Sequence, residues 1–232
     1  MRKGPGATLS VSWAVLVVAG ALAIFLGKVF HVDAPLFLWT ARQVAASPGD
    51  FFGFEVNWLG HRAPMPTAMM NPPLLGYYLG LMTAWLGSSE GAVHAALLVF
   101  PVAAALGTAN LARRMGADPA LALLATAATP AFLIYGSSAM SDMMLLALWV
   151  WAIDQWIRGT REGDSAALLR SGILIAAAAL TKFYGIALVP LLAAYALVAR
   201  RSGAAAPLAP LLAAIAIPLA ALLAYDRLTS EV

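Results

Sequence analysis

The sequence predicts an all-α polytopic membrane protein, a bundle of transmembrane helices with about seven crossings and a large first outer loop that carries interfacial helices. Of the 232 residues, 62% are hydrophobic and only 11% are charged, whereas a soluble domain has about 25% charged residues. The apolar residues form continuous runs instead of alternating with polar ones, which favours helices over a membrane barrel. This composition excludes soluble, disordered, collagenous and disulfide-stapled proteins.

Charge and cysteine content narrow the classes of function. The net charge of +3 is small and indicates no nucleic-acid partner. The chain has no cysteine, which excludes a thiolate metal site and a thiol nucleophile.

The first predicted element is a transmembrane helix over residues 9–30, directly after Arg2 and Lys3. A bilayer core of about 30 Å needs roughly 20 apolar residues in a helix. The run is longer than the roughly 7 to 15 residues typical of a secretory signal, and no small-residue cleavage site follows it closely. We therefore predict an uncleaved signal-anchor with the N-terminus in the cytoplasm.

The next segment, residues 31–91, is the most polar and proline-rich part of the chain and is predicted to be an outer loop. Within it, residues 35–46 are expected to form a helix in the membrane interface. Residues 73–86 are apolar, but at about 14 residues they have the length of a buried or re-entrant helix. We expect this second helix not to cross the membrane.

Residues 92–225 are expected to hold the remaining crossings of a single transmembrane module. One run, residues 168–199, would be about 48 Å long as a helix, too long for one crossing and short for two. Its only charged residue is Lys182, so we expect the chain to fold back there. The apolar runs are residues 92–112, 119–135, 143–157, 168–199 and 207–225.

The distribution of basic residues sets the orientation. With residues 73–86 outside and a fold-back near Lys182, nine of the 14 Lys and Arg residues face the cytoplasm, in agreement with the positive-inside rule. If residues 73–86 crossed instead, seven of these nine would move outside. The nine are Arg2, Lys3, Arg113, Arg114, Arg158, Arg161, Arg170, Arg200 and Arg201.

This topology gathers the chemically useful residues on one face. Asp33, Asp142 and Lys182 would all lie at the outer side, together with the loop of residues 31–91. We therefore expect a plasma (inner) membrane protein whose active face is external or periplasmic.

Each of these residues also has a purely structural interpretation. Asp33 stands before Pro35 and would cap the following helix; as a fixed, ionised carboxylate it would also accept a proton from a substrate hydroxyl. Asp142 would likewise cap the helix that begins at residue 143. Lys182 would extend its ammonium to water, or would bind a phosphate or another partner.

Other polar residues carry less specific signals. Asp154 precedes Arg158 by one helical turn and is expected to pair with it, without a function. His61, Arg62 and Asn71 lie in an extended, proline-rich loop that is either a linker or a substrate-facing surface. A divalent cation would find ligands in His31, Asp33, His61 and Asp142, but no metal-binding spacing such as HExxH is present, and no metal ligand is assigned.

An ordered series of motifs resembles one family. An Asp follows the first span, an Asn-Pro-Pro-Leu-Leu-Gly-Tyr-Tyr segment begins at Asn71, and an Ala-Arg-Arg-Met-Gly turn spans residues 112–116. A Ser-Asp pair ends at Asp142 and a Leu-Thr-Lys turn ends at Lys182. The series resembles the amino-terminal half of the GT-C membrane glycosyltransferases, in the branch of protein O-mannosyltransferases and lipid A aminoarabinose transferases.

The resemblance implies a transferase that moves a sugar from a polyprenyl-phosphate carrier to an acceptor hydroxyl, with inversion, at the outer face of the membrane. The acceptor would be a lipid, a glycan or a protein. By this resemblance Asp33 is the catalytic aspartate, and Asp142 supports it near the acceptor or a metal. Lys182 would lie near the lipid phosphate, and Asn71 would face the substrate. Arg62, with His61 beside it, would add positive charge for the substrate.

Two departures from the family pattern stand out. Ala34 follows Asp33 where many relatives have a second acidic residue, and the chain stops at Val232 where relatives continue. We therefore expect a fragment truncated at its C-terminus. The alternatives are a transporter or flippase-like bundle with Asp142 and Lys182 along a substrate pathway, or a non-catalytic fragment.

Overall fold

The structure is a computed structural model that describes residues 10–31, 33–201 and 207–230, and it confirms the all-α class. In order, the helices are α1 (Val11–Ala23), α2 (Ala34–Ala46), α3 (Met65–Ala68), α4 (Leu74–Leu86), α5 (Glu90–Leu97), α6 (Val99–Arg114), α7 (Pro119–Ala127), α8 (Pro130–Gly136), α9 (Asp142–Glu162), α10 (Ser165–Thr181), the 3₁₀ helix η1 (Phe183–Ala187), α11 (Leu188–Arg201) and α12 (Leu208–Ser230).

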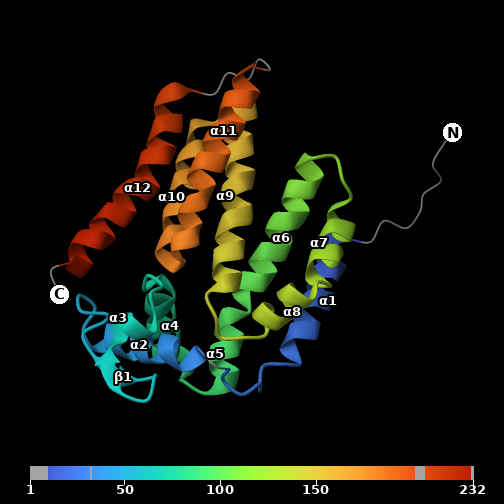
Figure 1. Cartoon of the computed structure of the whole chain (residues 1–232). Coiled ribbons are helices and arrows are strands. Elements are labelled where there is room, and N and C mark those ends of the chain that lie inside the picture. Colours follow the sequence, from blue (N-terminus) through green and yellow to red (C-terminus); the bar gives the residue numbers. More distant parts are fainter. Residues whose placement is uncertain (1–9, 32, 202–206, 231–232) are drawn as a thin grey trace.

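The helices form a bundle with two distinct ends (Figure 1). Helices α2 to α5 gather at one end, the lower one in Figure 1, together with the start of α9 and the close of α10. We call this the α2 end. The opposite end, which we call the arginine end, carries Arg113 and Arg114 at the close of α6 and the turn from α9 to α10. Asp164, between α9 and α10, and Arg200, in the last turn of α11, lie at this end (Figure 1). Arg2 and Lys3 lie outside the described residues.

Helix α1 is shorter than the predicted span of residues 9–30. The helix ends at Ala23, and the next residues form a turn in which the amide of Lys28 donates to the carbonyl of Phe25 at 3.0 Å. Bonds of this i to i+3 type tighten a helix end. The turn brings Lys28 out of the helix, so the prediction of one long first helix was wrong.

The predicted span over residues 119–135 is broken into α7 and α8, whose axes differ by 72°. The break falls at Thr129-Pro130, because a residue before proline is disfavoured in the α conformation and proline lacks an amide hydrogen. Thr129 is extended (φ −69°, ψ 138°), and its hydroxyl accepts from the amide of Phe132 at 3.3 Å. The threonine therefore ends one helix and caps the next.

The chain folds back at Lys182, as predicted. Lys182 is extended (φ −155°, ψ 134°), so α10 ends at Thr181 and η1 starts the return through α11. The turn is tight because a Cβ added at Gly185 would lie 2.2 Å from the carbonyl carbon of Ala178. Only glycine permits the return segment to approach the last turn of α10 this closely.

Three helical stretches of the described chain are long and apolar enough to cross a membrane: Glu90–Arg114, Phe183–Arg200 and Leu208–Thr229. The bent pair α7–α8 brings the number to four if it counts as one span. Three shorter apolar helices, α1, α4 and α10, complete the apolar set. The predicted segments are therefore present as helices, and the number of seven crossings stays a prediction.

The α2 end has its own hydrophobic core, which joins distant parts of the sequence. Ala34 and Leu36 of α2, Leu75 and Leu79 of α4, and Met144 of α9 are buried in one cluster. Helix α4 is also fixed to the start of the next span, because the Tyr78 hydroxyl donates to the carbonyl of Ala96 at 2.6 Å. Burial also raises the pKa of the Tyr78 hydroxyl.

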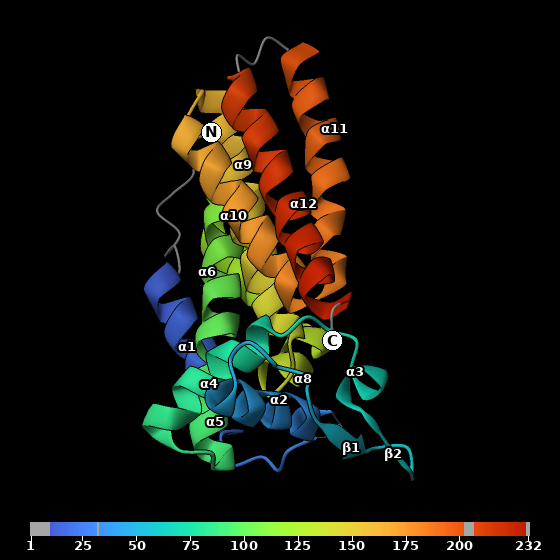
Figure 2. The ribbon, with the colours of Figure 1, turned by 90° about the vertical axis from the view of Figure 1, so that its left-hand side faces the viewer.

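A small antiparallel sheet extends from the α2 end and was not predicted. Strands β1 (Glu55–Asn57) and β2 (Arg62–Pro64) pair with Val56 opposite Ala63. Figure 2 shows this hairpin projecting away from the bundle.

The predicted pair of Asp154 with Arg158 is absent from the described ion pairs, and the structure replaces it. Asp154, 1% exposed, binds Arg114 with an Nε to Oδ1 distance of 2.8 Å. Arg158 instead binds Asp164 at 2.9 Å, across the turn between α9 and α10. Arg158 also lies 3.6 Å from Glu162, one turn further along α9. The buried Asp154 is therefore paired by a contact between packed helices, whereas Arg158 has partners both within its own helix and across the turn.

Candidate functional site

An ion pair joins two of the predicted site residues at the α2 end. The ammonium nitrogen of Lys182 lies 2.7 Å from Oδ1 of Asp142. The two side chains are 22% and 26% exposed, so the pair is neither fully solvated nor sealed from a ligand. A hydrogen-bonded ion pair of this kind fixes where the ammonium points.

The local backbone positions both residues of this ion pair. Lys182 is the extended residue between α10 and η1, so its side chain leaves the helical hairpin at the turn. Asp142 is the first residue of α9, and Ser141 holds the N-cap position without a capping hydrogen bond from its side chain. The predicted capping role of Asp142 was therefore wrong. Its carboxylate binds Lys182, and it still lies where the helix dipole favours negative charge.

Two polar atoms next to this pair are buried without a hydrogen-bond partner among the described residues. They are the Ser141 hydroxyl oxygen and Oδ2 of Asp142. Ser141 is 1% exposed. Leaving such a group unsatisfied costs about 1 to 3 kcal/mol, and native proteins leave few of them. The start of α9 therefore has unused hydrogen-bonding capacity beside a fixed positive charge.

A second lysine contacts the loop between α8 and α9. Lys28, in the turn after α1, donates from its ammonium to the hydroxyl of Ser138 at 3.0 Å. Lys28 thus contacts Ser138 in the loop between α8 and α9, and Lys182 contacts Asp142 at the start of α9. Lys28 was not among the predicted site residues. Its place at the outer edge of the first span was the only signal in the sequence.

Asp33 lies at the same end of the bundle. It precedes α2 directly, is partly exposed, and makes no capping hydrogen bond to the helix, so the capping interpretation was wrong. The next residue, Ala34, is buried in the same core as Ala139 and Met144, which flank Asp142. The segment that carries Asp33 and the segment that carries Asp142 therefore contribute to one hydrophobic core.

The three remaining predicted residues are spread over the loop of residues 31–91. His61 and Arg62 are exposed, His61 in the turn of the projecting hairpin and Arg62 at the first residue of β2. Asn71 is partly buried at the bend before α4. Their roles toward a substrate stay predictions. Among the described residues, no three His, Asp or Glu side chains converge as metal ligands, and the residues suggested for a divalent cation form no such group.

Two hollows at the α2 end were not predicted. The larger, about 590 Å³, lies between the 49–55 segment, residues 64–70, Phe183 and the last turns of α12. The smaller, about 550 Å³, lies beside α2 and β1 and is bordered by Trp39 and Arg42. Phe54 and Glu55 line both hollows. Phe183, which lines the larger hollow, follows Lys182 directly in the sequence.

The sequence offered one weak signal for the larger hollow. Aromatic residues cluster at Phe51-Phe52 and Phe54, and an aromatic-acidic pair lies at Tyr225-Asp226. Nothing in the sequence places these two segments side by side.

Comparison with known proteins gives one match. A family model described as dolichyl-phosphate-mannose-protein mannosyltransferase matches residues 70–225, more than half of the chain. The matched range contains Asn71, Asp142 and Lys182, whereas Asp33, His61 and Arg62 precede it. No curated protein and no solved structure matches the chain.

Proposed function

The chain belongs to the dolichyl-phosphate-mannose-protein mannosyltransferase family, and from this premise we propose that it transfers a sugar from a polyprenyl-phosphate carrier to an acceptor hydroxyl at the outer face of the membrane. The observation that carries the proposal is the ion pair of Lys182 with Asp142, at the end of the bundle that also holds Asp33. A fixed ammonium ion beside the membrane is suited to a lipid phosphate.

Lys182 is the proposed site for the phosphate of the carrier. An ammonium group has three N–H donors, and the described contacts use one of them, toward Asp142. The other two donors are free to bind phosphate oxygens. In this arrangement Asp142 is a positioning residue, because it fixes the ammonium and limits its rotation.

The proposed chemistry is a direct displacement. The acceptor oxygen forms a bond to the anomeric carbon of the sugar, and the bond from that carbon to the carrier phosphate breaks. The electron pair leaves with the phosphate, whose new charge meets Lys182. The hydroxyl proton passes to the Asp33 carboxylate, which acts as the general base. Attack opposite the leaving group inverts the anomeric centre.

The experiment is transfer by the purified full chain, reconstituted in lipid with a panel of radiolabelled polyprenyl-phosphate sugars. We expect one donor to give labelled acceptor, and we expect Asp33→Asn to lower the rate by about 10²-fold or more. The matched control is Asp118→Asn, which changes a capping aspartate at the arginine end. Asn and Asp cap about equally well, so the control should keep its activity.

Two outcomes would reject the proposal. Equal loss in both variants would remove Asp33 from the chemistry, and passage of the substrate across the membrane without transfer would favour the transporter alternative. The orientation has its own test, since the native chain has no cysteine. Ser88→Cys at the α2 end should react with a membrane-impermeant maleimide from outside, and Ala117→Cys at the arginine end only after permeabilisation.

A further inference from the structure

We infer that the larger hollow at the α2 end is a binding site for an organic ammonium ion, a protonated or quaternary amine with attached apolar carbon. The hollow, about 590 Å³, is lined by residues from opposite ends of the sequence, including Phe51, Phe183, Tyr225 and Asp226. Nothing in the transferase proposal assigns these residues, and the inference holds whether or not sugar transfer occurs.

Three aromatic rings meet in this hollow at different angles. The rings of Phe51 and Tyr225 are stacked, with centroids 6.2 Å apart and planes 20° from parallel. The ring of Phe183 meets Tyr225 nearly edge-on, at 5.8 Å and 66°. The hollow therefore has aromatic walls of more than one orientation. Such walls attract ammonium ions, because the face of each ring is electron-rich.

Acidic side chains supply the matching charge. Asp50, Glu55 and Asp226 line the same hollow, and within the part of the chain that the structure describes none of the three has an ion-pair partner. Carboxylates are acceptors only when ionised, and they favour a cation that brings N–H donors or a diffuse positive charge.

The same charges exclude the alternative ligand. A phosphate group in this hollow would face three carboxylates, and the described residues that line the hollow include no Lys or Arg. An apolar ligand without charge would gain the aromatic contact and nothing from the carboxylates. An ammonium ion with apolar substituents uses both features of the wall.

The probe is choline, compared with its neutral isostere 3,3-dimethylbutan-1-ol, by isothermal titration of the full chain in detergent micelles. The two molecules share size and hydroxyl and differ in the charged atom. We expect choline to bind about 10- to 30-fold more tightly, as one well-placed cation–π contact supplies. Equal binding of both probes, or binding of neither, would overturn the inference.

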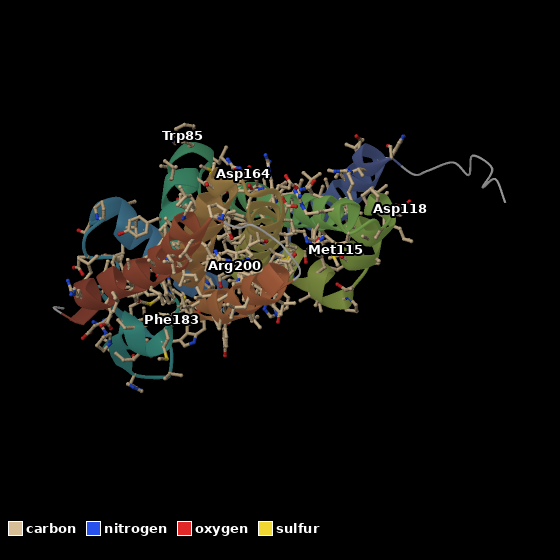
Figure 3. All side chains as sticks on the ribbon, turned by 90° about the horizontal axis from the view of Figure 1, so that it is seen from above. Trp85, Met115, Asp118, Asp164, Phe183 and Arg200 are labelled. Carbon is tan, nitrogen blue, oxygen red and sulfur yellow. The ribbon has the colours of Figure 1, made fainter. Side chains whose placement is uncertain are left out.

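Two pairs of variants locate the site. Asp226→Asn should weaken choline binding about two- to five-fold, as for the loss of one solvated charge contact, and Glu90→Gln, outside the hollow, should not. Phe183→Leu should weaken it by a similar two- to five-fold factor. Its control is Trp85→Leu, which changes an aromatic ring exposed at the periphery (Figure 3). Loss of binding in the controls as well would reject this location.

A displacement experiment distinguishes the two classes of molecule that could carry the ammonium group, a lipid headgroup and an amino sugar. Displacement of bound choline by dihexanoylphosphatidylcholine, but not by dihexanoylphosphatidylglycerol, would assign the hollow to a lipid headgroup. Displacement by glucosamine, but not by N-acetylglucosamine, would assign it to an amino sugar. Displacement by the neutral or anionic member of either pair to the same degree would contradict recognition of an ammonium ion.

Discussion

The ammonium of Lys182 lies 2.7 Å from the carboxylate of Asp142, and this contact joins the turn after α10 to the first turn of α9. Removing one partner leaves the other as a partly buried charge, whereas removing both leaves none. The pair therefore links the stability of the bundle to the group proposed to bind phosphate.

We predict that Lys182→Met lowers stability by about 1 to 3 kcal/mol, because it leaves Asp142 unpaired. Adding Asp142→Asn to this variant should recover part of the loss. The measurement is a double-mutant cycle on the thermal midpoint in detergent. Strictly additive effects would mean that the two side chains do not interact in the folded protein.

At the arginine end, Arg114→Met should destabilise the protein by about 3 to 5 kcal/mol, since it strands a buried carboxylate. Asp154 is 1% exposed, and Arg114 binds it at 2.8 Å. The neighbour Arg113 is exposed and binds only Asn110 among the described contacts, so Arg113→Met is the matched control. Thermal unfolding of the two variants should differ clearly, and equal midpoints would refute the buried pair.

Gly185→Ala should destabilise the turn that carries Lys182, by about 1 to 3 kcal/mol. A Cβ at this position would lie 2.2 Å from the backbone of Ala178, so α10 and η1 would have to separate. The control is Gly20→Ala in α1, where a Cβ has no atom within 4 Å and alanine should stabilise the helix slightly. Thermal midpoints that move in the same direction for both variants would contradict this packing.

Stability should fall in acid partly through Asp164. The hydrogen bond from the amide of Ala167 lowers the pKa of Asp164 below its ordinary value of 3.8, and the charges of Arg158 and Arg170 act in the same direction. The stabilisation is therefore complete above the unfolded pKa and is lost as the pH falls through the lower, folded one. Wild type should exceed Asp164→Asn in thermal midpoint at pH 7, and this gap should narrow by pH 3. A gap that is constant with pH would contradict the lowered pKa.

Much of the fold could be predicted from the apolar runs of the sequence and from the charged residues that interrupt them. Continuous apolar runs predicted the helices, and the isolated charge of Lys182 predicted the fold-back, because a charge inside an apolar run marks a place where the chain reaches a polar environment. The bend at Pro130 was missed, since a kink leaves hydropathy unchanged. The short β-hairpin was missed because its strands have only three residues each.

The sequence indicated individual residues of the candidate site, but it did not indicate which of them contact one another. Asp33, Asp142 and Lys182 stood out as polar residues beside apolar runs, yet their contacts depend on how helices pack. The partner of Asp154 shows the same limit, because helix spacing favoured Arg158 whereas packing of α6 on α9 selected Arg114. Phe51 and Tyr225 meet only after the chain has folded. No local pattern indicates that meeting.

The wall shared by the two hollows at the α2 end has a practical consequence for mutagenesis. Phe54 and Glu55 form part of both hollows, so a substitution at either position alters two cavities at once and any resulting phenotype is ambiguous. To assign a phenotype to one hollow, a substitution must be made at a residue that lines only that hollow. Arg42 lines only the smaller of the two, and Asp226 lines only the larger.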